Sequence, residues 1–259
     1  MPIGSPDDLL KKQVAAVQEY SILAGTAIAD LFTRPRYWND IFLQMDSIGV
    51  GSMPIIILTG FFTGCVLALQ SATALQEFGA MSKTGILVAL SMVRELGPVL
   101  TGLMVSGRNS SGMASEIGSM KVTEQIDAMR ALGTDPIRKL VVPRIVATVF
   151  MLFFLTIISD AVGIAGGAMV GVGLMGLNAH SYLVNSYHGL VYGDIIQGLC
   201  KPIFFGFIIS SVGCFYGMRT TGGTQGVGRS TTQAVVVSSV SIILVDFLIS
   251  RVMLSIFGN

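Results

Sequence analysis

Long apolar runs without a charged residue dominate the hydrophobic pattern of this chain. Three such stretches cover residues 47–76, 161–193 and 202–218. A helix needs about 20 consecutive, mostly apolar residues to cross the hydrocarbon core of a bilayer. The runs therefore predict membrane-spanning helices, and the chain is predicted to be an all-α membrane protein.

About five spans are predicted: residues 53–76, 85–107, a third beginning near residue 145, 202–218 and 234–257. Glycines recur four residues apart in two of them, at Gly60 and Gly64 and again at Gly163, Gly167 and Gly171. Because no side chain separates the backbones there, glycines at this spacing let another helix approach closely. We expect close helix contacts at these positions.

The first 50 residues are predicted to form an N-terminal interfacial region ahead of a transmembrane domain at 51–259. Within residues 7–33, mostly apolar residues recur at alternating steps of four and three, so they would form one stripe along a helix: Leu10, Val14, Val17, Ser21, Ala24, Ile28 and Leu31. Charges interrupt this segment too often for a span, so we expect an amphipathic helix in the membrane interface. A soluble helix packed on a partner is the alternative. Basic and aromatic residues at 34–38 suit headgroup depth.

Composition and loop charges set the class and the orientation. Charged residues make up only 12% of the chain, against about a quarter in soluble domains, and the net charge of +1 gives no indication of nucleic-acid binding. Of the 16 basic residues, twelve fall on one side of the predicted spans: Lys11, Lys12, Arg34, Arg36, Arg108, Lys121, Arg130, Arg138, Lys139, Arg144, Arg219 and Arg229. The positive-inside rule then predicts a cytoplasmic N-terminus and a periplasmic C-terminus, with Lys201 at the opposite edge of the fourth span.

A short cytoplasmic helix is predicted from Thr123 to Leu132, within a segment at about 122–133. Acidic Glu124 and Asp127 near its start and Arg130 near its end agree with the helix dipole, and Gly133 is expected to end it. Its apolar face consists of Val122, Ile126, Met129 and Leu132. Such a face suits docking in a groove of a partner; packing back on the membrane domain is the alternative.

Two charges inside the second span are the other strong signal. An ionisable side chain at membrane depth normally faces a cavity, a partner or a substrate, which makes Arg94 and Glu95 candidate site residues. Neighbours on a helix point about 100° apart, so we do not expect these two to pair with each other. Pro98 permits a kink just beyond. A structural ion pair with another helix is the alternative, and for Asp160 and Asp246 we prefer the structural interpretation.

No catalytic or metal-binding motif is identified. The glycine-rich stretch at 222–229 lacks the lysine of a phosphate loop, and HExxH and GxSxG are absent. We expect these glycines to form a tight cytoplasmic connection between the fourth and fifth spans. Cys65, Cys200 and Cys214 are expected to be free buried thiols, and His180 and His188 ordinary loop residues.

Several motifs in order resemble the MlaE (YrbE-like) permease family. They are Val-Arg-Glu-Leu-Gly-Pro-Val-Leu at 93–100, Gly-Arg at 107–108, Ala-Ser-Glu-Ile-Gly-Ser-Met at 114–120, Thr-Glu-Gln-Ile-Asp-Ala-Met at 123–129, Asp-Pro at 135–136, the glycines at 222–228 and Thr-Thr-Gln-Ala-Val-Val at 231–236. The resemblance extends over about residues 50–257.

The resemblance implies a homodimeric ABC transporter permease in the inner membrane of a diderm bacterium. Such a permease moves phospholipids between the inner and outer membranes and maintains outer-membrane lipid asymmetry. Separate ATPase subunits would bind ATP and Mg²⁺, so this chain would hold no cofactor and would not be an enzyme. Further implied partners are a periplasmic ring of MCE-domain proteins and, in some members, a STAS-domain protein.

The resemblance also assigns roles to individual residues. Lipid contacts or positions near the lipid cavity are implied for Leu67, Ala74, Leu75, Phe78, Arg94 and Glu95. Coupling to the ATPase is implied for Glu124, Ile126, Asp127, Met129 and Arg130. Family members often carry tyrosine where Phe78 stands.

Other functions stay open on sequence grounds. The chain could import other lipids or sterols, or act as a non-transporting scaffold for an ATPase complex. An intramembrane enzyme would use Asp160 and Asp246 as a carboxylate pair and would need both to face each other at one depth. The direction of transport, the lipid headgroup and the partner stoichiometry are not fixed by the sequence.

Overall fold

The described part of the chain, residues 6–31, 33 and 37–257 of a computed structural model, is helical and contains no strand. Five helical segments are long and apolar enough to cross a membrane: Trp38–Gln76, Met81–Val122, Ile137–Gly173, Tyr192–Met218 and Gly223–Ile256. The predicted all-α membrane fold with about five spans is therefore confirmed.

The α-helices are α1 (Pro6–Asp30), α2 (Trp38–Gln76), α3 (Thr84–Ser91), α4 (Gly97–Val105), α5 (Ser111–Val122), α6 (Gln125–Ala131), α7 (Val142–Gly173), α8 (Ala179–His188), α9 (Tyr192–Met218) and α10 (Gly223–Phe257). A 3₁₀ turn, η1 (Met81–Lys83), precedes α3. Three π-helical turns interrupt the spans: η2 (Met92–Leu96), η3 (Ser106–Ser110) and η4 (Ile137–Val141).

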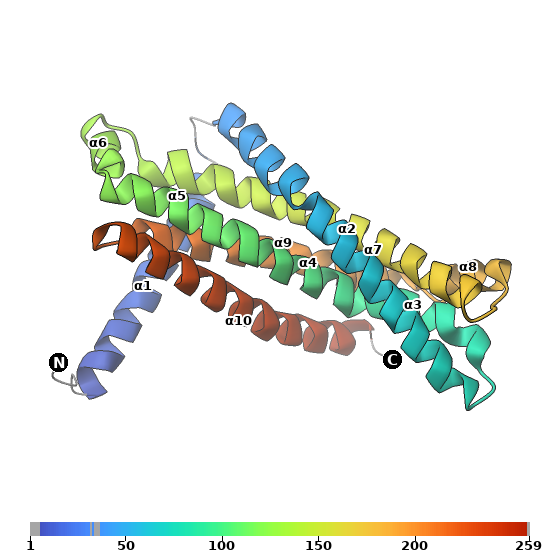
Figure 1. Cartoon of the computed structure of the whole chain (residues 1–259). Coiled ribbons are helices and arrows are strands. Elements are labelled where there is room, and N and C mark those ends of the chain that lie inside the picture. Colours follow the sequence, from blue (N-terminus) through green and yellow to red (C-terminus); the bar gives the residue numbers. More distant parts are fainter. Residues whose placement is uncertain (1–5, 32, 34–36, 258–259) are drawn as a thin grey trace.

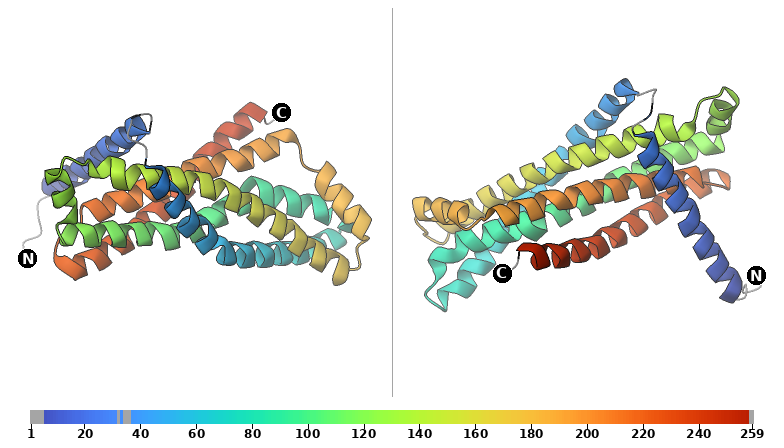
Figure 2. Two further views of the ribbon diagram at one scale, coloured as in Figure 1. Left: turned by 90° about the horizontal axis from the view of Figure 1, so that it is seen from above. Right: turned by 180° about the vertical axis from the view of Figure 1, so that it is seen from behind.

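The spans form an elongated bundle with two distinct ends (Figure 1). Helix α6 lies at one end and α8 at the other, and α1 crosses the outside of the bundle near the α6 end (Figure 2). The segments that carry most basic loop residues thus lie together at the α6 end.

Several helices extend beyond the predicted spans. Helix α2 begins at Trp38 rather than near residue 53, α9 at Tyr192 rather than 202, and α10 at Gly223 rather than 234. The second span was predicted to end at residue 107, but the helix continues as η3 and α5 to Val122. Hydropathy marks only the part of a helix at bilayer depth, whereas backbone hydrogen bonds sustain a helix into the polar interface.

The glycine-rich connection is only partly as expected. Gly222 and Gly223 have φ of +86° and +68° and make the turn between α9 and α10. Gly226 and Gly228 lie inside α10 instead. A left-handed φ costs a residue with a Cβ about 1–2 kcal/mol, which explains glycine at 222 and 223 but not at the two helical positions.

Closely packed glycines join α2 to α7. A Cβ on Gly64 would collide with the backbone carbonyl of Gly163, and one on Gly60 would come within 2.9 Å of the Ser159 carbonyl oxygen. The close helix contact predicted for these positions is confirmed. A Cβ on Gly171 would lie 3.1 Å from the ring of Tyr182 on α8. A Cβ on Gly167 would lie 2.7 Å from the Tyr182 hydroxyl and 3.3 Å from the Gly64 carbonyl oxygen.

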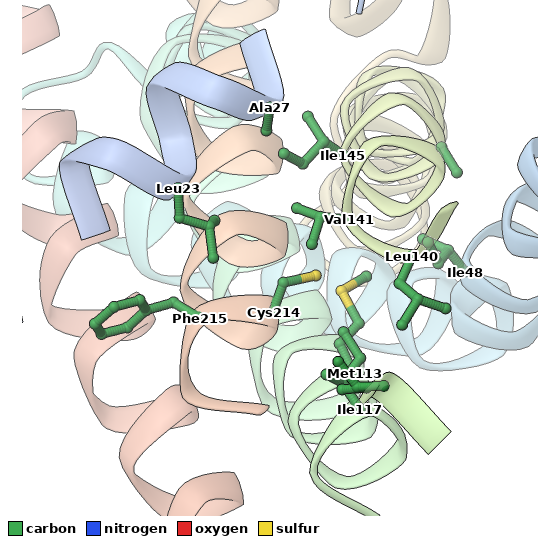
Figure 3. Packing of buried hydrophobic residues seen from close by; sticks show 12 residues of the cluster. Leu23, Ala27, Ile48, Met113, Ile117, Leu140, Val141, Ile145, Cys214 and Phe215 are labelled. Atoms are coloured by element: carbon green, nitrogen blue, oxygen red, sulfur yellow. The ribbon is translucent and has the colours of Figure 1, made fainter. Parts of the chain in front are cut away.

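The largest hydrophobic cluster lies toward the α6 end and joins six helices and η4 (Figure 3). It includes Leu23 and Ala27 of α1, Ile48 of α2, Met113 and Ile117 of α5, Ile126 of α6, Leu140 and Val141 of η4, Ile145 and Ala147 of α7, and Cys214 and Phe215 of α9. Burial of these side chains holds α1 and α6 against the spans.

Helix α1 packs through a different face from the predicted stripe. Leu23 and Ala27 are buried, while Val14, Val17 and Ile28 of the stripe are 66%, 65% and 48% exposed. Ala24 of the stripe is buried and Leu31 is half-buried. The contact with the bundle is therefore made through Leu23, Ala24 and Ala27, and the rest of the described stripe is left uncovered. The side chain of Leu10 and residues 34–36 lie outside the described residues.

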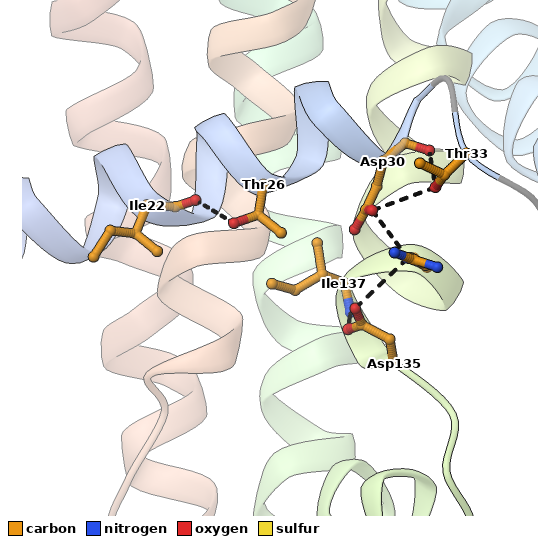
Figure 4. A network of polar contacts seen from close by, with 7 residues as sticks. Ile22, Thr26, Asp30, Thr33, Asp135 and Ile137 are labelled. Atoms are coloured by element: carbon orange, nitrogen blue, oxygen red, sulfur yellow. Dashed lines mark hydrogen bonds and ion pairs between the residues drawn. The ribbon is translucent and has the colours of Figure 1, made fainter.

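Polar contacts fix the end of α1. Arg138 of η4 donates from Nε to Asp30 Oδ1 over 2.9 Å, and Thr33 also contacts that oxygen at 3.3 Å. Figure 4 shows this network together with Asp135, whose carboxylate accepts from the Ile137 amide over 2.9 Å. The ion pair ties α1 to the start of the third span.

Candidate functional site

A π-helical turn presents the two charges of the second span. Arg94 and Glu95 lie in η2, where one extra residue widens the helix; π-turns of this kind occur frequently at functional sites. Pro98 has no N–H and cannot donate to the Arg94 carbonyl. The ammonium group of Lys201 on α9 donates to that oxygen instead, over 2.8 Å.

Lys201 is the centre of a charge cluster shared by three spans. Its side chain is fully buried and its Nζ lies 2.6 Å from Glu95 Oε2 and 2.8 Å from Asp246 Oδ1 of α10. Glu95 Oε1 also accepts from Gln197 and Ser250, at 3.3 and 3.0 Å. A buried ammonium is stable only when it is paired and hydrogen-bonded, and this lysine meets both conditions.

Arg94 pairs with a second helix end. Its Nε donates to Asp194 Oδ1 over 2.6 Å, while Asp194 Oδ2 accepts from the Val191 amide at 3.0 Å and caps the start of α9. The prediction that Arg94 and Glu95 do not pair with each other is confirmed. Both have structural ion-pair partners, and both retain exposed surface, with 41% and 43% of the side chain accessible.

Lys201 and Asp194 also belong to this site, although neither was predicted from the sequence. Lys201 was expected at the outer edge of a span, whereas it lies inside α9 with no accessible surface. The available signal was a lysine between Cys200 and Pro202 with no basic neighbour. Such a residue needs a carboxylate from another span, and the other spans contain three, Glu95, Asp160 and Asp246, with no indication in the sequence of which ones pair with it.

Asp160 and Asp246 do not form the pair that an intramembrane carboxylate enzyme would need. Asp246 binds Lys201, whereas Asp160 lies against Gly97, whose missing Cβ leaves space for the carboxylate oxygen. Asp160 Oδ1 is buried and has no hydrogen-bond partner in the part of the chain that the structure describes. Asp246 thus lies against Lys201 of the fourth span, and Asp160 against Gly97 of the second.

An apolar cavity adjoins the charged turn. It has a volume of about 370 Å³ and is lined by Phe62, Thr63, Val66, Leu67, Gln70 and Leu96. Leu67 thus shares a cavity with Leu96, the residue directly after Glu95. The other predicted lipid contacts lie farther along α2 and do not line this cavity: Ala74 is exposed, Leu75 half-buried and Phe78 81% exposed.

The predicted cytoplasmic helix is present as α6, and its end has the expected geometry. Gly133 has φ +77°, and the amides of Gly133 and Thr134 donate to the carbonyls of Arg130 and Met129, over 3.0 and 2.9 Å. This hydrogen-bond pair is the Schellman motif. Glu124 precedes the helix with φ +60°, a left-handed conformation unusual for glutamate.

The apolar face expected on α6 is divided between two environments. Ile126 is fully buried in the large cluster and Met129 packs against it, whereas Leu132 is 83% exposed. Lys121 holds Asp127 at 2.9 Å, and Arg130 lies 3.7 Å from the same carboxylate. Val122, Leu132 and the charged side chains of this segment are therefore exposed, while Ile126 anchors the helix to the bundle.

Comparisons with known proteins agree with this architecture. A family model described as Permease MlaE matches residues 41–252. A probable ABC transporter permease protein of Rickettsia felis is 43% identical over 240 residues, 93% of each chain. The intermembrane phospholipid transport system permease protein MlaE of Haemophilus influenzae is 37% identical over 211 residues, 81% of each chain.

A plant relative is also similar. The Arabidopsis thaliana chloroplastic protein TRIGALACTOSYLDIACYLGLYCEROL 1 is 36% identical over 229 residues, 88% of this chain and 65% of that protein. Five apolar spans, a charged π-turn in the second, and sequence matches along almost the whole chain lead to one assignment: the chain belongs to the MlaE permease family of ABC transporter membrane subunits.

Proposed function

We propose that the chain is the permease of a transporter that moves phospholipids between the inner and outer membranes and so maintains outer-membrane lipid asymmetry. The observation that carries the proposal is the apolar cavity at Leu67 and Leu96 directly beside the partly exposed charges of Arg94 and Glu95. A two-part surface of this kind suits an amphiphile, with its acyl chain in the cavity and its headgroup at the charges. The phospholipid in the printed name of the Haemophilus relative supports that substrate class.

The proposed complex contains two copies of this chain and two ATPase subunits. ATP and Mg²⁺ would bind to the ATPase, since this sequence carries no phosphate-loop motif. Coupling would involve the exposed part of the 122–133 segment: Glu124, Asp127, Arg130 and Leu132, with Ile126 and Met129 holding α6 in place. An MCE-domain ring and a STAS-domain protein are the other proposed partners.

The proposed location is the bacterial inner membrane, with the α6 end in the cytoplasm and the α8 end in the periplasm. The basic residues of the α6 end support this orientation. The N-terminus would then be cytoplasmic and the C-terminus periplasmic. Accessibility labelling of single cysteines in α6 and α8 of a cysteine-free variant tests it, and periplasmic labelling of α6 would contradict it.

Reconstitution tests the transport function. The complex with its ATPase is placed in vesicles, and ATP-driven transfer of labelled phospholipid is measured for wild type, Glu95→Ala and Glu95→Gln. We expect both variants to lose transfer while ATP hydrolysis continues. If the Glu95→Ala complex transfers phospholipid at the wild-type rate, the carboxylate of the charged turn is not needed for transport.

A scaffold without transport activity and a permease for sterols or other lipids are the competing functions. The scaffold predicts an intact complex with no lipid transfer in any condition. Mass spectrometry of lipids that copurify with the complex separates phospholipids from sterols. A neighbouring pair of genes for an ATPase and an MCE-domain protein would favour the phospholipid transporter.

A further inference from the structure

A second cavity lies between α2 and the start of α5, separate from the charged turn. Its volume is about 280 Å³, and its lining residues are Gln44, Ser47, Ile48, Arg108, Asn109, Gly112, Met113 and Glu116. It lies where the apolar part of the first two spans gives way to polar residues, at the α6 end. In the proposed orientation this is the depth of the cytoplasmic headgroups.

Arg108 is held over this cavity with part of its guanidinium unused. Nη1 donates to the Ser47 carbonyl at 3.0 Å, to Ser52 Oγ at 3.1 Å and to Asn109 Oδ1 at 3.3 Å. Within the described residues, Nε and Nη2 have no acceptor and no carboxylate lies within 4 Å. Gly51 leaves room for the guanidinium, because a Cβ there would collide with it.

Other donors around the cavity also lack acceptors. Asn109 is only 7% exposed, and its Nδ2 has no acceptor among the described residues. Arg144 is buried behind Glu116, and its Nε likewise has no partner. A buried donor left without an acceptor costs about 1–3 kcal/mol. The two buried donors of Asn109 and Arg144, next to the exposed and partly unpaired guanidinium of Arg108, therefore indicate a missing acceptor.

The charges indicate the sign of that acceptor. Glu116 lines the cavity, but it is already paired with Arg144, with Nη2 to Oε2 at 2.7 Å. The two arginines and one glutamate leave one positive charge uncompensated, and that charge is on Arg108. Arginine presents planar paired donors that match the oxygens of a phosphate.

We propose that this cavity is a phosphate-binding site, with Arg108 and Asn109 as its donors, and that the phosphate belongs to a phospholipid of the cytoplasmic leaflet. The site is distinct from the charged turn at Arg94 and Glu95. Its lipid would be retained whether or not the chain transports it, so failure of transport and failure of binding at this site are separate results.

Asn109→Asp is the most informative substitution, because it changes the charge of the cavity with almost no change in side-chain size. The substitution keeps size and keeps an acceptor for Arg108, but it supplies the missing carboxylate inside the protein and repels a phosphate. Wild type, Asn109→Asp and Arg108→Gln are purified as full chains in detergent with their ATPase partners. Arg229→Gln is the control, since Arg229 is exposed in the described structure and has no carboxylate within 4 Å.

Native mass spectrometry then measures retention of added phosphatidylglycerol, phosphatidylethanolamine, diacylglycerol with the same chains, and inorganic phosphate. We expect Asn109→Asp and Arg108→Gln to weaken binding of both phospholipids about tenfold, with Asn109→Asp as thermally stable as wild type and Arg229→Gln unchanged. Diacylglycerol should bind equally weakly to all four proteins.

Two results would overturn the proposal. If both variants retain phospholipid as wild type does, the cavity does not bind phospholipid. If Arg229→Gln loses phospholipid to the same extent as the two variants, the loss is an effect of general surface charge and not of this site. If inorganic phosphate at millimolar concentration binds wild type but not Arg108→Gln, and phospholipid retention is the same in all proteins, the phosphate site stands and its lipid source is wrong.

Discussion

At the scale of single residues, the glycines determine how closely the helices and their polar side chains can pack, as much as the charged residues do. Gly64 and Gly163 bring the backbones of α2 and α7 into contact, Gly97 leaves space for Asp160, and Gly51 does the same for Arg108. Each glycine permits a close approach that a methyl group would block. Polar groups could then be accommodated between spans without widening the bundle.

Gly64→Ala tests the contact between α2 and α7. A Cβ there would collide with the Gly163 backbone, which cannot rotate away, so we expect a loss of about 1–3 kcal/mol of unfolding free energy. Thermal unfolding of the purified protein in detergent measures it. Gly228→Ala is the control, because nothing lies near that position and alanine favours a helix. Equal stability of the Gly64→Ala protein would contradict the contact.

Lys201→Met tests the charge cluster. The change leaves Glu95 and Asp246 without their cation, and breaking a buried ion pair costs about 3–5 kcal/mol. The matched control adds Glu95→Gln and Asp246→Asn to the same protein, and it should recover most of the lost stability because no uncompensated charge is left. Chemical unfolding in mild detergent compares the two. A Lys201→Met protein as stable as wild type would show that the cluster is not coupled.

Tyr182 gives a prediction for alkaline pH. Burial raises the pKa of Tyr182 to about 12, with a smaller contribution from the nearby Cys65 thiol. Because the folded pKa exceeds the unfolded value of about 10, the stability is present below pH 10 and is lost as pH rises toward 12. Tyr182→Phe removes this loss, and it should be neutral at pH 7 because the hydroxyl has no partner. Unfolding curves from pH 8 to pH 11 should diverge only at the alkaline end.

At the scale of elements, different residues of α6 hold the helix on the bundle and form its exposed surface, which is the proposed contact with the ATPase. Ile126 points into the large cluster while Leu132 points outward, so substitutions at the two positions should have different results. We expect Ile126→Asp to destabilise the chain by burying an unpaired charge. Leu132→Asp should leave thermal unfolding unchanged and weaken copurification of the ATPase subunit. If the Leu132→Asp chain retains the ATPase at wild-type stoichiometry and coupling, the assignment of this surface is wrong.

At the scale of the whole molecule, one chain leaves much apolar surface uncovered. In the most apolar stretch of α10, only 11% of the residues are buried inside the structure. The side chains of Phe247 and Ile243 are 64% and 56% exposed. Lipid covers part of such a surface, and in the proposed dimer a second copy around a two-fold axis would cover another part. Light scattering of the detergent-solubilised chain, corrected for detergent mass, should give two copies. A single copy at micromolar concentration would contradict the dimer.

The fold class and the spans of this protein could be predicted from the sequence, because a helix that crosses a bilayer needs about 20 consecutive, mostly apolar residues. The apolar runs predicted the spans, Gly60, Gly64 and Gly163 were correctly predicted to lie at close helix contacts, and Gly133 was correctly predicted to end a helix. Gly171 has the same spacing but lies against the ring of Tyr182. The family motifs located α6 and the charged turn by residue number. Helix ends were wrong by up to about 15 residues at α2, because the rule ceases to apply where the chain leaves the hydrocarbon.

Only the tertiary structure decided which residues share a site. Nothing in the order of residues indicates that Lys201 lies between Glu95 and Asp246, that Asp160 lies against Gly97 away from Asp246, or that Ile126 is anchored while Leu132 is free. These relations depend on how three or more helices rotate about their axes and pack, and hydrophobic periodicity constrains that rotation weakly when lipid surrounds most faces. The sequence by itself therefore determined the class, the spans and their glycine contacts, while packing determined the ion pairs and the cavities.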